Sequence, residues 1–229
     1  SRPYIVMTLK IMAEFGIKAN FKGNVISVLP QQYKAASIDI EPDWSGASYW
    51  YSFVALASGG EIFLPNLKEA SVQGDQVIKD IMTELGVSST FSKDGTSLKK
   101  MDHKNEVNID FTHCPDLAQT VAVVCAAKNI KCKMTGLESL KIKETDRVAA
   151  LQNELSKIGA RLNEFDSYWI LEPSNSLPEK VTIKTYDDHR MAMAFAPLAS
   201  LMNVTIENPK VVNKSFPNFW KEVNKLFKI

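Results

Sequence analysis

The sequence predicts a mixed α/β fold built from repeated units of about 70 residues. Gly16, Gly86 and Gly159 are 70 and 73 residues apart, and each closes a segment with the apolar spacing of an amphipathic helix. Segments that are apolar on nearly every face lie between the amphipathic segments. Short runs rich in β-branched residues follow both the amphipathic and the apolar segments. A fixed internal period of this kind indicates a repeat architecture.

The amphipathic segments carry apolar residues three and four positions apart, as Leu151, Leu155 and Ile158 do. We expect a half-buried helix in each, ended by a glycine in the left-handed conformation. These segments are residues 8–17, 78–87, 151–160 and 216–227, the last without its glycine.

Three alanine-rich segments, 46–58, 116–128 and 189–201, are apolar on nearly every face. A helix tolerates that pattern only when protein surrounds it, so these are predicted core helices. Strands are expected at residues 25–30, 60–65, 130–136, 167–173, 180–185 and 203–209. Each unit then combines one buried helix, one half-buried helix and several strands.

The composition excludes several classes of function. The net charge of +1 provides no general attraction to nucleic acid or to an anionic membrane, so an anionic ligand needs a local cationic cluster. The three cysteines show no metal-binding spacing, and we expect no metal. No apolar run approaches the roughly 20 residues that span a bilayer, which predicts a cytoplasmic protein.

A domain boundary is expected within residues 37–48, where Pro42, Gly46 and several polar residues interrupt the helical pattern. Residues 1–40 would be the tail of one domain and residues 41–229 a second domain. The repeats are uneven, with four amphipathic segments and three buried ones. We therefore expect the parent protein to extend beyond the N-terminus of this sequence.

Charged residues precede the amphipathic helix that Gly159 closes. Lys143 and Arg147 are four residues apart, and Glu144 is three residues from Arg147, so their side chains can meet at a helix start. Backbone N–H groups and two cations at such a start suit a phosphate or a carboxylate. A solvated turn with ordinary ion pairs is the alternative interpretation.

Residues 186–193 carry charged side chains directly into a predicted core helix. Burying such charges costs free energy unless they face a cleft and bind something, so a functional role is favoured. Asp187 or Asp188 could instead cap the helix. An Asp-His pair without a recognisable nucleophile elbow gives little support to hydrolase chemistry.

Asp116 also begins a predicted core helix, where an N-cap is the simplest interpretation. Its place in the repeat matches that of residues 188–190. If the repeats pack around a pseudo-threefold axis, these helix starts point the same way and form one polar cleft. Lys214 holds the place of Lys143 in the following unit.

Ser1 and Tyr4 hold the same place before the first amphipathic helix, and Gln73 and Asp75 before the second. We interpret Gln73 and Asp75 as turn and N-cap residues.

The motifs KETDR at residues 143–147, YDDHRMAM at 186–193 and SRPYI at 1–5 resemble signatures of the EPSP synthase family of enolpyruvyl transferases. Shorter matches in the same order are QGD at 73–75, PDLAQT at 115–120 and KSFP at 214–217. The resemblance covers essentially the whole chain. It implies two domains, each built from βαβαββ units in an inside-out arrangement with buried helices and outer sheets.

The resemblance also implies a reaction. Members of the family transfer the enolpyruvyl group of phosphoenolpyruvate to the 5-hydroxyl of shikimate 3-phosphate and release phosphate, without a metal or an organic cofactor. The two domains close on the substrates, and the family's first domain has no counterpart in this sequence. We therefore expect little activity from this chain alone.

Carried over to this sequence, the resemblance implies three groups of site residues. Those implied to bind phosphoenolpyruvate are Arg147, His189, Arg190 and Lys214. Those implied to bind shikimate 3-phosphate are Ser1, Tyr4, Asp116, Ser139 and Lys143. Those implied in catalysis are Asp116 and Lys143, at the 5-hydroxyl, and Glu144, in proton transfer at the methylene carbon. Ser139 departs from the asparagine that family members often carry.

Two other functions remain open at this stage. One is the related transferase that acts on UDP-N-acetylglucosamine, and the other is a non-catalytic substrate-binding module on the same scaffold. As partners we expect the two small substrates and the absent first domain, with no nucleic acid, no membrane and a monomeric state.

Overall fold

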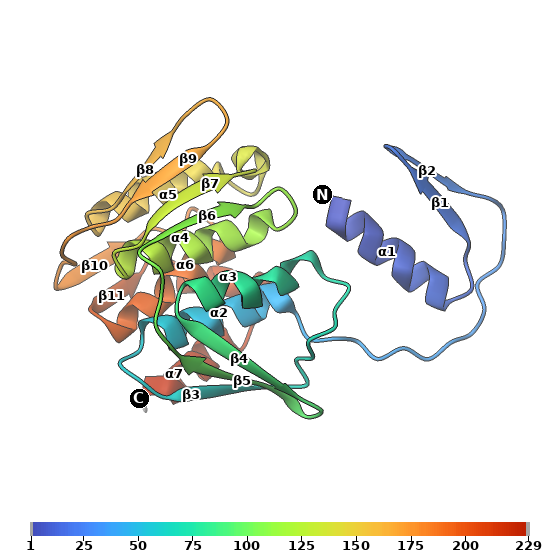
Figure 1. Ribbon diagram of the computed structural model, residues 1–229, viewed down its shortest axis with the longest axis horizontal. Helices are drawn as coiled ribbons and strands as arrows, with labels where there is room; N and C mark the ends of the chain where they lie inside the picture. The colour runs from blue at the N-terminus through green and yellow to red at the C-terminus, as the bar shows by residue number, and fades with distance from the viewer. Residues whose placement is uncertain (1, 228–229) are drawn as a thin grey trace.

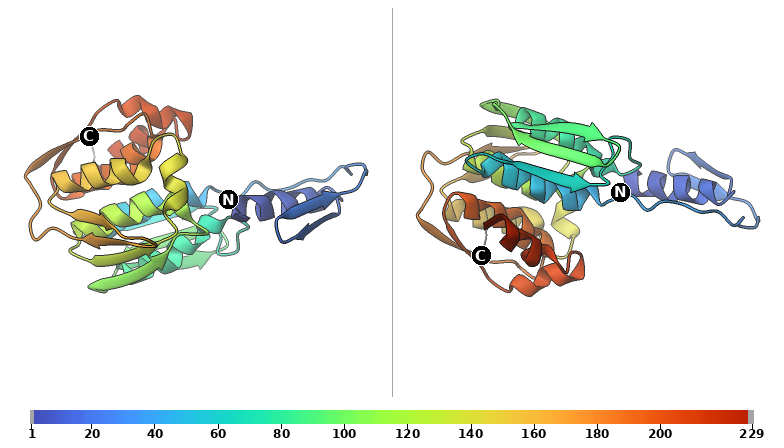
Figure 2. Two further views of the ribbon diagram at one scale, coloured as in Figure 1. Left: turned by 90° about the horizontal axis from the view of Figure 1, so that it is seen from above. Right: turned by 90° about the horizontal axis from the view of Figure 1, so that it is seen from below.

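The computed structural model describes residues 2–227, so Ser1 and residues 228–229 lie outside it. The chain from Trp44 onward forms one body, and an N-terminal part projects from it (Figures 1 and 2). Within residues 2–227, no helix combines the length and the apolar character needed to cross a membrane.

Three buried helices form the centre of the body. They are α2 (Trp44–Leu56), α4 (Ala118–Ala127) and α6 (His189–Phe195). Helix α4 packs against both α2 and α6, and the side chains of all three are almost entirely buried. The prediction of core helices is confirmed.

The core helices differ from the predicted ranges at their ends, and at α4 and α6 proline explains the difference. Helix α6 stops at Phe195 and continues as the 3-10 turn η4 (Ala196–Ser200), because Pro197 has no N–H and crowds the preceding turn. Another 3-10 turn, η2 (Pro115–Leu117), starts at a proline and leads into α4.

The sheets lie outside the helices (Figure 1). One has the order β3-β5-β4, one the order β6-β7-β9-β8, and β10 pairs with β11 in parallel. Their bounds are β3 Glu61–Pro65, β4 Val87–Ser92, β5 Gly95–Lys100, β6 Glu106–Asp110, β7 Lys131–Thr135, β8 Arg161–Glu164, β9 Trp169–Glu172, β10 Lys180–Ile183 and β11 Asn203–Ile206. Buried and exposed side chains alternate along β7 and β10, so one face of each sheet covers the helices.

The segment from β6 to β9 forms a complete βαβαββ unit. Its elements run β6, α4, β7, α5 (Arg147–Lys157), β8 and β9, with β6 and β7 parallel and β9 antiparallel to both β7 and β8. The segment of β10, α6, β11 and α7 (Phe219–Phe227) repeats its first four elements, and the segment of α2, β3, α3 (Ile78–Glu84), β4 and β5 repeats its last five. The inside-out arrangement of repeated units predicted from the sequence is therefore confirmed.

The half-buried helices follow the predicted period. They are α1 (Arg2–Glu14), α3 (Ile78–Glu84), α5 (Arg147–Lys157) and α7 (Phe219–Phe227). Gly16, Gly86 and Gly159 have φ angles of +80°, +96° and +81°, as expected for glycines that close helices. Helix α7 begins at Phe219, later than predicted, because Pro217 disfavours a helical backbone for the residue before it; the 3-10 turn η5 (Pro209–Lys214) lies upstream.

The N-terminal part consists of α1 and the hairpin of β1 (Ala19–Lys22) and β2 (Val25–Val28), and an extended segment joins it to α2. No side chain of α1 within residues 2–14 is fully buried. Its first turn reaches the body, where the hydroxyl of Tyr4 donates to Asp116 at 2.9 Å.

Gly136, which follows β7, offers a test of this packing. Its φ is +75°, and a Cβ atom at this position would stand 2.3 Å from the backbone nitrogen of Thr112. We predict that Gly136→Ala lowers the free energy of unfolding by at least about 2 kcal/mol, through left-handed backbone strain and the clash. Urea denaturation measures the change.

Gly59→Ala is the matched control, because Gly59 has open space around its Cβ position and no positive φ. Equal effects of the two substitutions would contradict the prediction.

Candidate active site

Three helix starts meet at one end of the body and carry charged side chains into a single cluster. Asp116 lies in η2 ahead of α4, Arg147 is the first residue of α5, and Asp188 is the N-cap of α6. Hydrogen bonds join Arg147 to both carboxylates, although Asp116 lies 31 positions before it in the chain and Asp188 lies 41 positions after it. The repeat therefore brings together side chains that are distant in sequence.

The guanidinium of Arg147 stands at the centre of the cluster, with an exposure of 2 %. Its Nε donates to Asp188 Oδ2 at 2.6 Å, its Nη1 to Asp116 Oδ1 at 2.9 Å and its Nη2 to Glu144 Oε2 at 2.8 Å. The N-cap of its helix is Asp146, whose Oδ1 accepts from the backbone N–H of Ala149 at 3.0 Å. Arg147 therefore holds three carboxylates of three different segments.

Asp116 collects donors from four directions. Besides Arg147, its Oδ2 accepts from Nη2 of Arg190 and from the hydroxyl of Tyr4, each at 2.9 Å, and Nζ of Lys143 lies 3.7 Å from its Oδ1. Burial by itself raises the pKa of Asp116, but Arg190, Lys143, Tyr4 and Arg147 together hold that pKa below its usual value. Asp116 is therefore ionised at neutral pH.

Glu144 sits where the cluster meets solvent. It accepts from Nζ of Lys214 at 2.9 Å and from Arg147 at 2.8 Å. The hydrogen bond from Lys214 is the main reason that its pKa falls to about 2. Glu144 thus links Arg147 of α5 to Lys214 at the end of η5.

His189 lies in the first turn of α6 and has an exposure of 7 %. Its Nδ1 is 3.7 Å from Asp188, and within residues 2–227 this buried nitrogen has no hydrogen-bond partner. Burial, followed by the positive charge of Arg190, lowers the pKa of His189. A neutral imidazole with an unused polar atom is therefore available beside the cluster.

The turn that leads into α6 is strained. Tyr186 and Asp187 both have a φ of +54°, and neither is glycine, so each residue costs about 1–2 kcal/mol of backbone strain. Asp188 then accepts from the backbone N–H of Arg190 at 2.8 Å and caps the helix. This turn sets the direction in which His189 and Arg190 enter the site.

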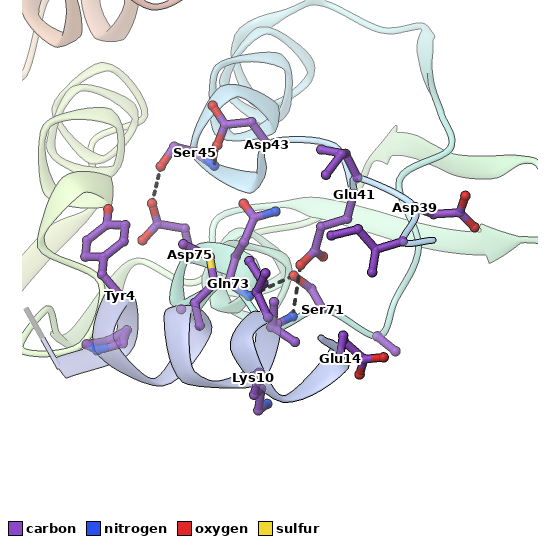
Figure 3. A pocket seen from close by; sticks show the side chains of 18 of the residues that line it. Tyr4, Lys10, Glu14, Asp39, Glu41, Asp43, Ser45, Ser71, Gln73 and Asp75 are labelled. Atoms are coloured by element: carbon purple, nitrogen blue, oxygen red, sulfur yellow. Dashed lines mark hydrogen bonds between the residues drawn. The ribbon is translucent and has the colours of Figure 1, made fainter. Parts of the chain in front are cut away.

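A cavity of about 790 Å³ adjoins the cluster, between α1, residues 37–43 and residues 70–75. Figure 3 shows Tyr4, Ser45 and Asp75 close together at one end of it, with Glu41 and Ser71 at the other. Tyr4 and Asp75 thus border the cavity, and the hydroxyl of Tyr4 also reaches Asp116 in the cluster.

Comparison with known proteins identifies the family. The family model for EPSP synthase (3-phosphoshikimate 1-carboxyvinyltransferase) matches residues 1–223. The chain belongs to the EPSP synthase family. The family resemblance of the sequence motifs is therefore confirmed.

Relatives of the EPSP synthase family match the chain along nearly its whole length. A Bacteroides fragilis protein named 3-phosphoshikimate 1-carboxyvinyltransferase is 43% identical over 231 residues, which cover 98% of this chain and 56% of that protein. A protein of the same name from Paraburkholderia phytofirmans is 36% identical, and the match covers 99% of this chain and 54% of the relative. The chain thus spans about half the length of these relatives.

Solved structures of EPSP synthase and of a related transferase have the same fold. The EPSP synthase of Acinetobacter baumannii superposes with a TM-score of 0.73 at 20% identity, over 94% of this chain and 53% of that one. The enolpyruvyl transferase NikO of Streptomyces tendae superposes with a TM-score of 0.65 at 16% identity, over 98% and 53%. At these identities the likeness concerns the fold alone.

Most of the site residues implied by the EPSP synthase resemblance lie in the cluster. Contacts of 3.7 Å or less join Tyr4, Asp116, Lys143, Glu144, Arg147, His189, Arg190 and Lys214 through Asp116, Glu144 and Asp188. Ser139 is exposed on the 3-10 turn η3 (Glu138–Ile142), which packs beside η2. Ser1 lies outside the described residues. The catalytic and binding roles of all these residues stay predictions.

Of Gln73 and Asp75, which we interpreted as turn and N-cap residues, only Gln73 has the expected role. The side chain of Gln73 accepts from the backbone N–H of Trp44 and donates to the carbonyl of Pro42, each at 2.8 Å, so it is a turn residue that organises the start of α2. Asp75 is not the N-cap expected: it lies inside the 3-10 turn η1 (Gly74–Val77), buried, and accepts from Ser45. Its equivalence to Lys143 in the repeat was the signal that could have placed it beside the site.

The central guanidinium predicts a large effect of substitution on stability. Arg147→Met removes the guanidinium that donates to the buried carboxylates of both Asp116 and Asp188, so we predict a loss of about 3–5 kcal/mol in the free energy of unfolding. Urea denaturation at neutral pH measures it. Lys99→Met, which removes an exposed 3.2 Å pair with Glu61, is the control and should cost less than about 1 kcal/mol. A loss from Arg147→Met no larger than the control's would contradict the prediction.

The pKa of Glu144 predicts a dependence on pH. Because this pKa lies near 2 rather than at its ordinary 4.5, ionised Glu144 stabilises the fold above about pH 4.5, and the contribution is lost as the pH falls toward 2. Lys214→Met should raise the pKa of Glu144 and move that loss to higher pH. Carbon-detected NMR titration of the Glu144 carboxyl group measures the pKa.

Lys225→Met is the control for this titration, because it removes another lysine–glutamate pair, with Glu222 at 2.6 Å. It should leave the titration of Glu144 unchanged. An unchanged midpoint in the Lys214→Met variant would show that Lys214 does not set this pKa.

Proposed function

We propose that this chain forms one part of an enzyme that transfers the enolpyruvyl group of phosphoenolpyruvate to the 5-hydroxyl of shikimate 3-phosphate and releases phosphate. Membership of the EPSP synthase family supports this proposal. The observation that carries it is the convergence of Arg147, Arg190, Lys143 and Lys214 on two carboxylates, Asp116 and Glu144, at a set of helix starts. Such a site suits two anionic substrates and a proton transfer.

Phosphoenolpyruvate carries a phosphate and a carboxylate, and Arg147, Arg190 and Lys214 bind them in our proposal. These cations pair with Asp116, Asp188 and Glu144 within the chain. An incoming anion shares or takes some of their donors. The neutral His189, with its unused Nδ1, adds a hydrogen-bonding group that carries no charge of its own.

The chemical steps then assign a task to each carboxylate. The 5-hydroxyl oxygen of shikimate 3-phosphate bonds to C2 of phosphoenolpyruvate, and its proton passes to Asp116 beside Lys143. Glu144, protonated from solvent once the bound substrates have raised its pKa, delivers a proton to the methylene carbon, which gives a tetrahedral intermediate. Glu144 then takes a proton back from the resulting methyl group, which restores the double bond, while Asp116 returns the hydroxyl proton to the departing phosphate. Fixed cations stabilise the negative charge of this sequence of steps.

Substrate binding prepares both carboxylates for proton transfer. The low pKa of Glu144 results mainly from its hydrogen bond with Lys214, and that of Asp116 from its cationic neighbours. When phosphoenolpyruvate draws Lys214 and Arg190 toward its own charges, each carboxylate loses part of the interaction that favours ionisation. Both pKa values then rise toward the range in which the groups can accept and return a proton.

The N-terminal part belongs to a neighbouring domain in this proposal, with residues 1–40 on one side of the boundary and 41–229 on the other. Val25, Ile26, Val28 and Leu29 are exposed, and the chain spans about half the length of its relatives. A first domain covers these side chains and supplies the rest of the shikimate 3-phosphate site. We expect a cytoplasmic monomer that needs no metal or cofactor. This chain alone should turn over little or nothing.

The experiment measures phosphate release from phosphoenolpyruvate and shikimate 3-phosphate, for the complete protein and for this chain alone. We predict turnover by the complete protein only, and a fall of about 10²-fold or more in kcat for Asp116→Asn and for Glu144→Gln. Glu172→Gln is the control, because Glu172 pairs with Lys131 at 3.3 Å in an exposed position. It should leave kcat unchanged.

Two results would contradict the proposal. Turnover with UDP-N-acetylglucosamine as acceptor instead of shikimate 3-phosphate would show the related transferase. Binding of both substrates without release of phosphate would show a binding module.

A further inference from the structure

The strained turn at Tyr186 and Asp187 lies directly before the residues that enter the site. Both residues have a φ of +54°, and Asp188, His189 and Arg190 follow at once. A left-handed pair of this kind persists only where neighbouring contacts fix it. The contacts that fix this turn come from residues to which the proposed chemistry gives no task.

Glu154 provides the first of these contacts. It lies on α5, two turns along from Arg147 and on the same side of the helix, with an exposure of 0 %. Its Oε1 accepts from the hydroxyl of Tyr186 at 2.8 Å, and its Oε2 accepts from the backbone N–H of Lys184 at 3.0 Å. The second oxygen also accepts from Nζ of Lys157 at 2.6 Å. One buried carboxylate therefore holds the chain on both sides of residue 185.

Asn208 holds the turn from the other side. Its side-chain nitrogen donates to Oδ1 of Asp187 at 3.1 Å. Asn208 itself has a φ of +45° and stands immediately before η5, the 3-10 turn that ends at Lys214. The turn is thus attached to α5, which begins with Arg147, and to η5, which ends with Lys214.

We propose that Glu154 and Tyr186 are positioning residues for the phosphoenolpyruvate side of the site. Their hydrogen bond fixes the left-handed turn, so that Asp188 meets Arg147 and α6 starts with His189 and Arg190 directed at the cluster. Neither residue contacts a reacting group. This inference rests on the function proposed above, because that function assigns phosphoenolpyruvate to Arg147, His189, Arg190 and Lys214.

A purely structural role makes a different prediction. Loss of a buried hydrogen bond that only stabilises the fold lowers the free energy of unfolding and leaves the KM of the folded enzyme unchanged. Loss of a positioning contact changes the geometry of His189 and Arg190, so it weakens phosphoenolpyruvate binding in the folded state. The binding of shikimate 3-phosphate, which we assign to other residues, is weakened less.

The test uses the complete protein with Tyr186→Phe, which removes only the hydroxyl. We expect the KM for phosphoenolpyruvate to rise roughly fivefold, the factor that corresponds to one lost hydrogen bond, while the KM for shikimate 3-phosphate changes less than twofold. Glu154→Gln keeps an oxygen that can accept from Tyr186, and we expect a smaller rise. Glu154→Leu, which removes the acceptor, should match or exceed Tyr186→Phe.

Tyr51→Phe is the matched control. The hydroxyl of the buried Tyr51 makes a hydrogen bond of the same length, 2.8 Å, with Ser89 on β4. This substitution removes one tyrosine hydroxyl outside the cluster, so it should change stability but neither KM. Equal KM values for Tyr186→Phe and Tyr51→Phe would overturn the inference.

Calorimetric titration with phosphoenolpyruvate alone separates this inference from the proposed function. If the wild-type protein binds phosphoenolpyruvate but does not use shikimate 3-phosphate, the proposed reaction fails, and a weaker affinity in Tyr186→Phe than in Tyr51→Phe still supports the positioning role. If the wild-type protein turns over and both variants bind equally, the positioning role alone fails. Absence of both binding and turnover in the wild-type protein would overturn both.

Discussion

The buried guanidinium of Arg147 is the interaction on which the arrangement of the site depends. It joins carboxylates from η2, from the N-cap of α6 and from the turn that precedes α5, so one side chain fixes the β6–β9 unit relative to the unit that contains α6. Burying an arginine costs several kcal/mol unless its donors are satisfied. Asp116, Asp188 and Glu144 satisfy them, and Arg190 and Lys214 in turn balance the charge of these carboxylates.

The repeated unit explains why these charges meet. Each unit buries one helix and covers it with strands, so the starts of successive core helices are brought to the same end of the body. Free N–H groups and the helix dipole at such starts favour negative charge, and Asp116 and Asp188 stand there. Both carboxylates bind Arg147 at the start of the amphipathic helix α5, and Asp116 also binds Arg190 at the start of the next core helix. The fold thereby holds these cations in place, as the proposed binding of anionic substrates requires.

Sequence patterns predicted the repeat, the core helices and the residues that gather in the site, because apolar periodicity and motif positions are local information. The pairing of those residues was not predictable in the same way. The simplest interpretation of Asp116 was an N-cap, yet its carboxylate accepts hydrogen bonds from Arg147 and Arg190. Asp188, by contrast, caps α6 and also binds Arg147. Glu154 lies three residues after Leu151 and four before Ile158, on the buried face of α5, where a charged side chain is unexpected. Only its contacts with Tyr186 and Lys184, 30 or more residues away, explain its burial.

The same network connects the N-terminal part to the chemistry of the site. The hydroxyl of Tyr4 on α1 donates to Asp116, and burial together with Asp116 raises the pKa of Tyr4, so this group remains a donor at neutral pH. The bond lowers the pKa of Asp116 and exists only while α1 lies against the body. By reciprocity, protonation of Asp116 weakens the attachment of α1, and displacement of α1 makes Asp116 more basic. The position of α1 and the protonation of Asp116 are therefore linked through one hydrogen bond.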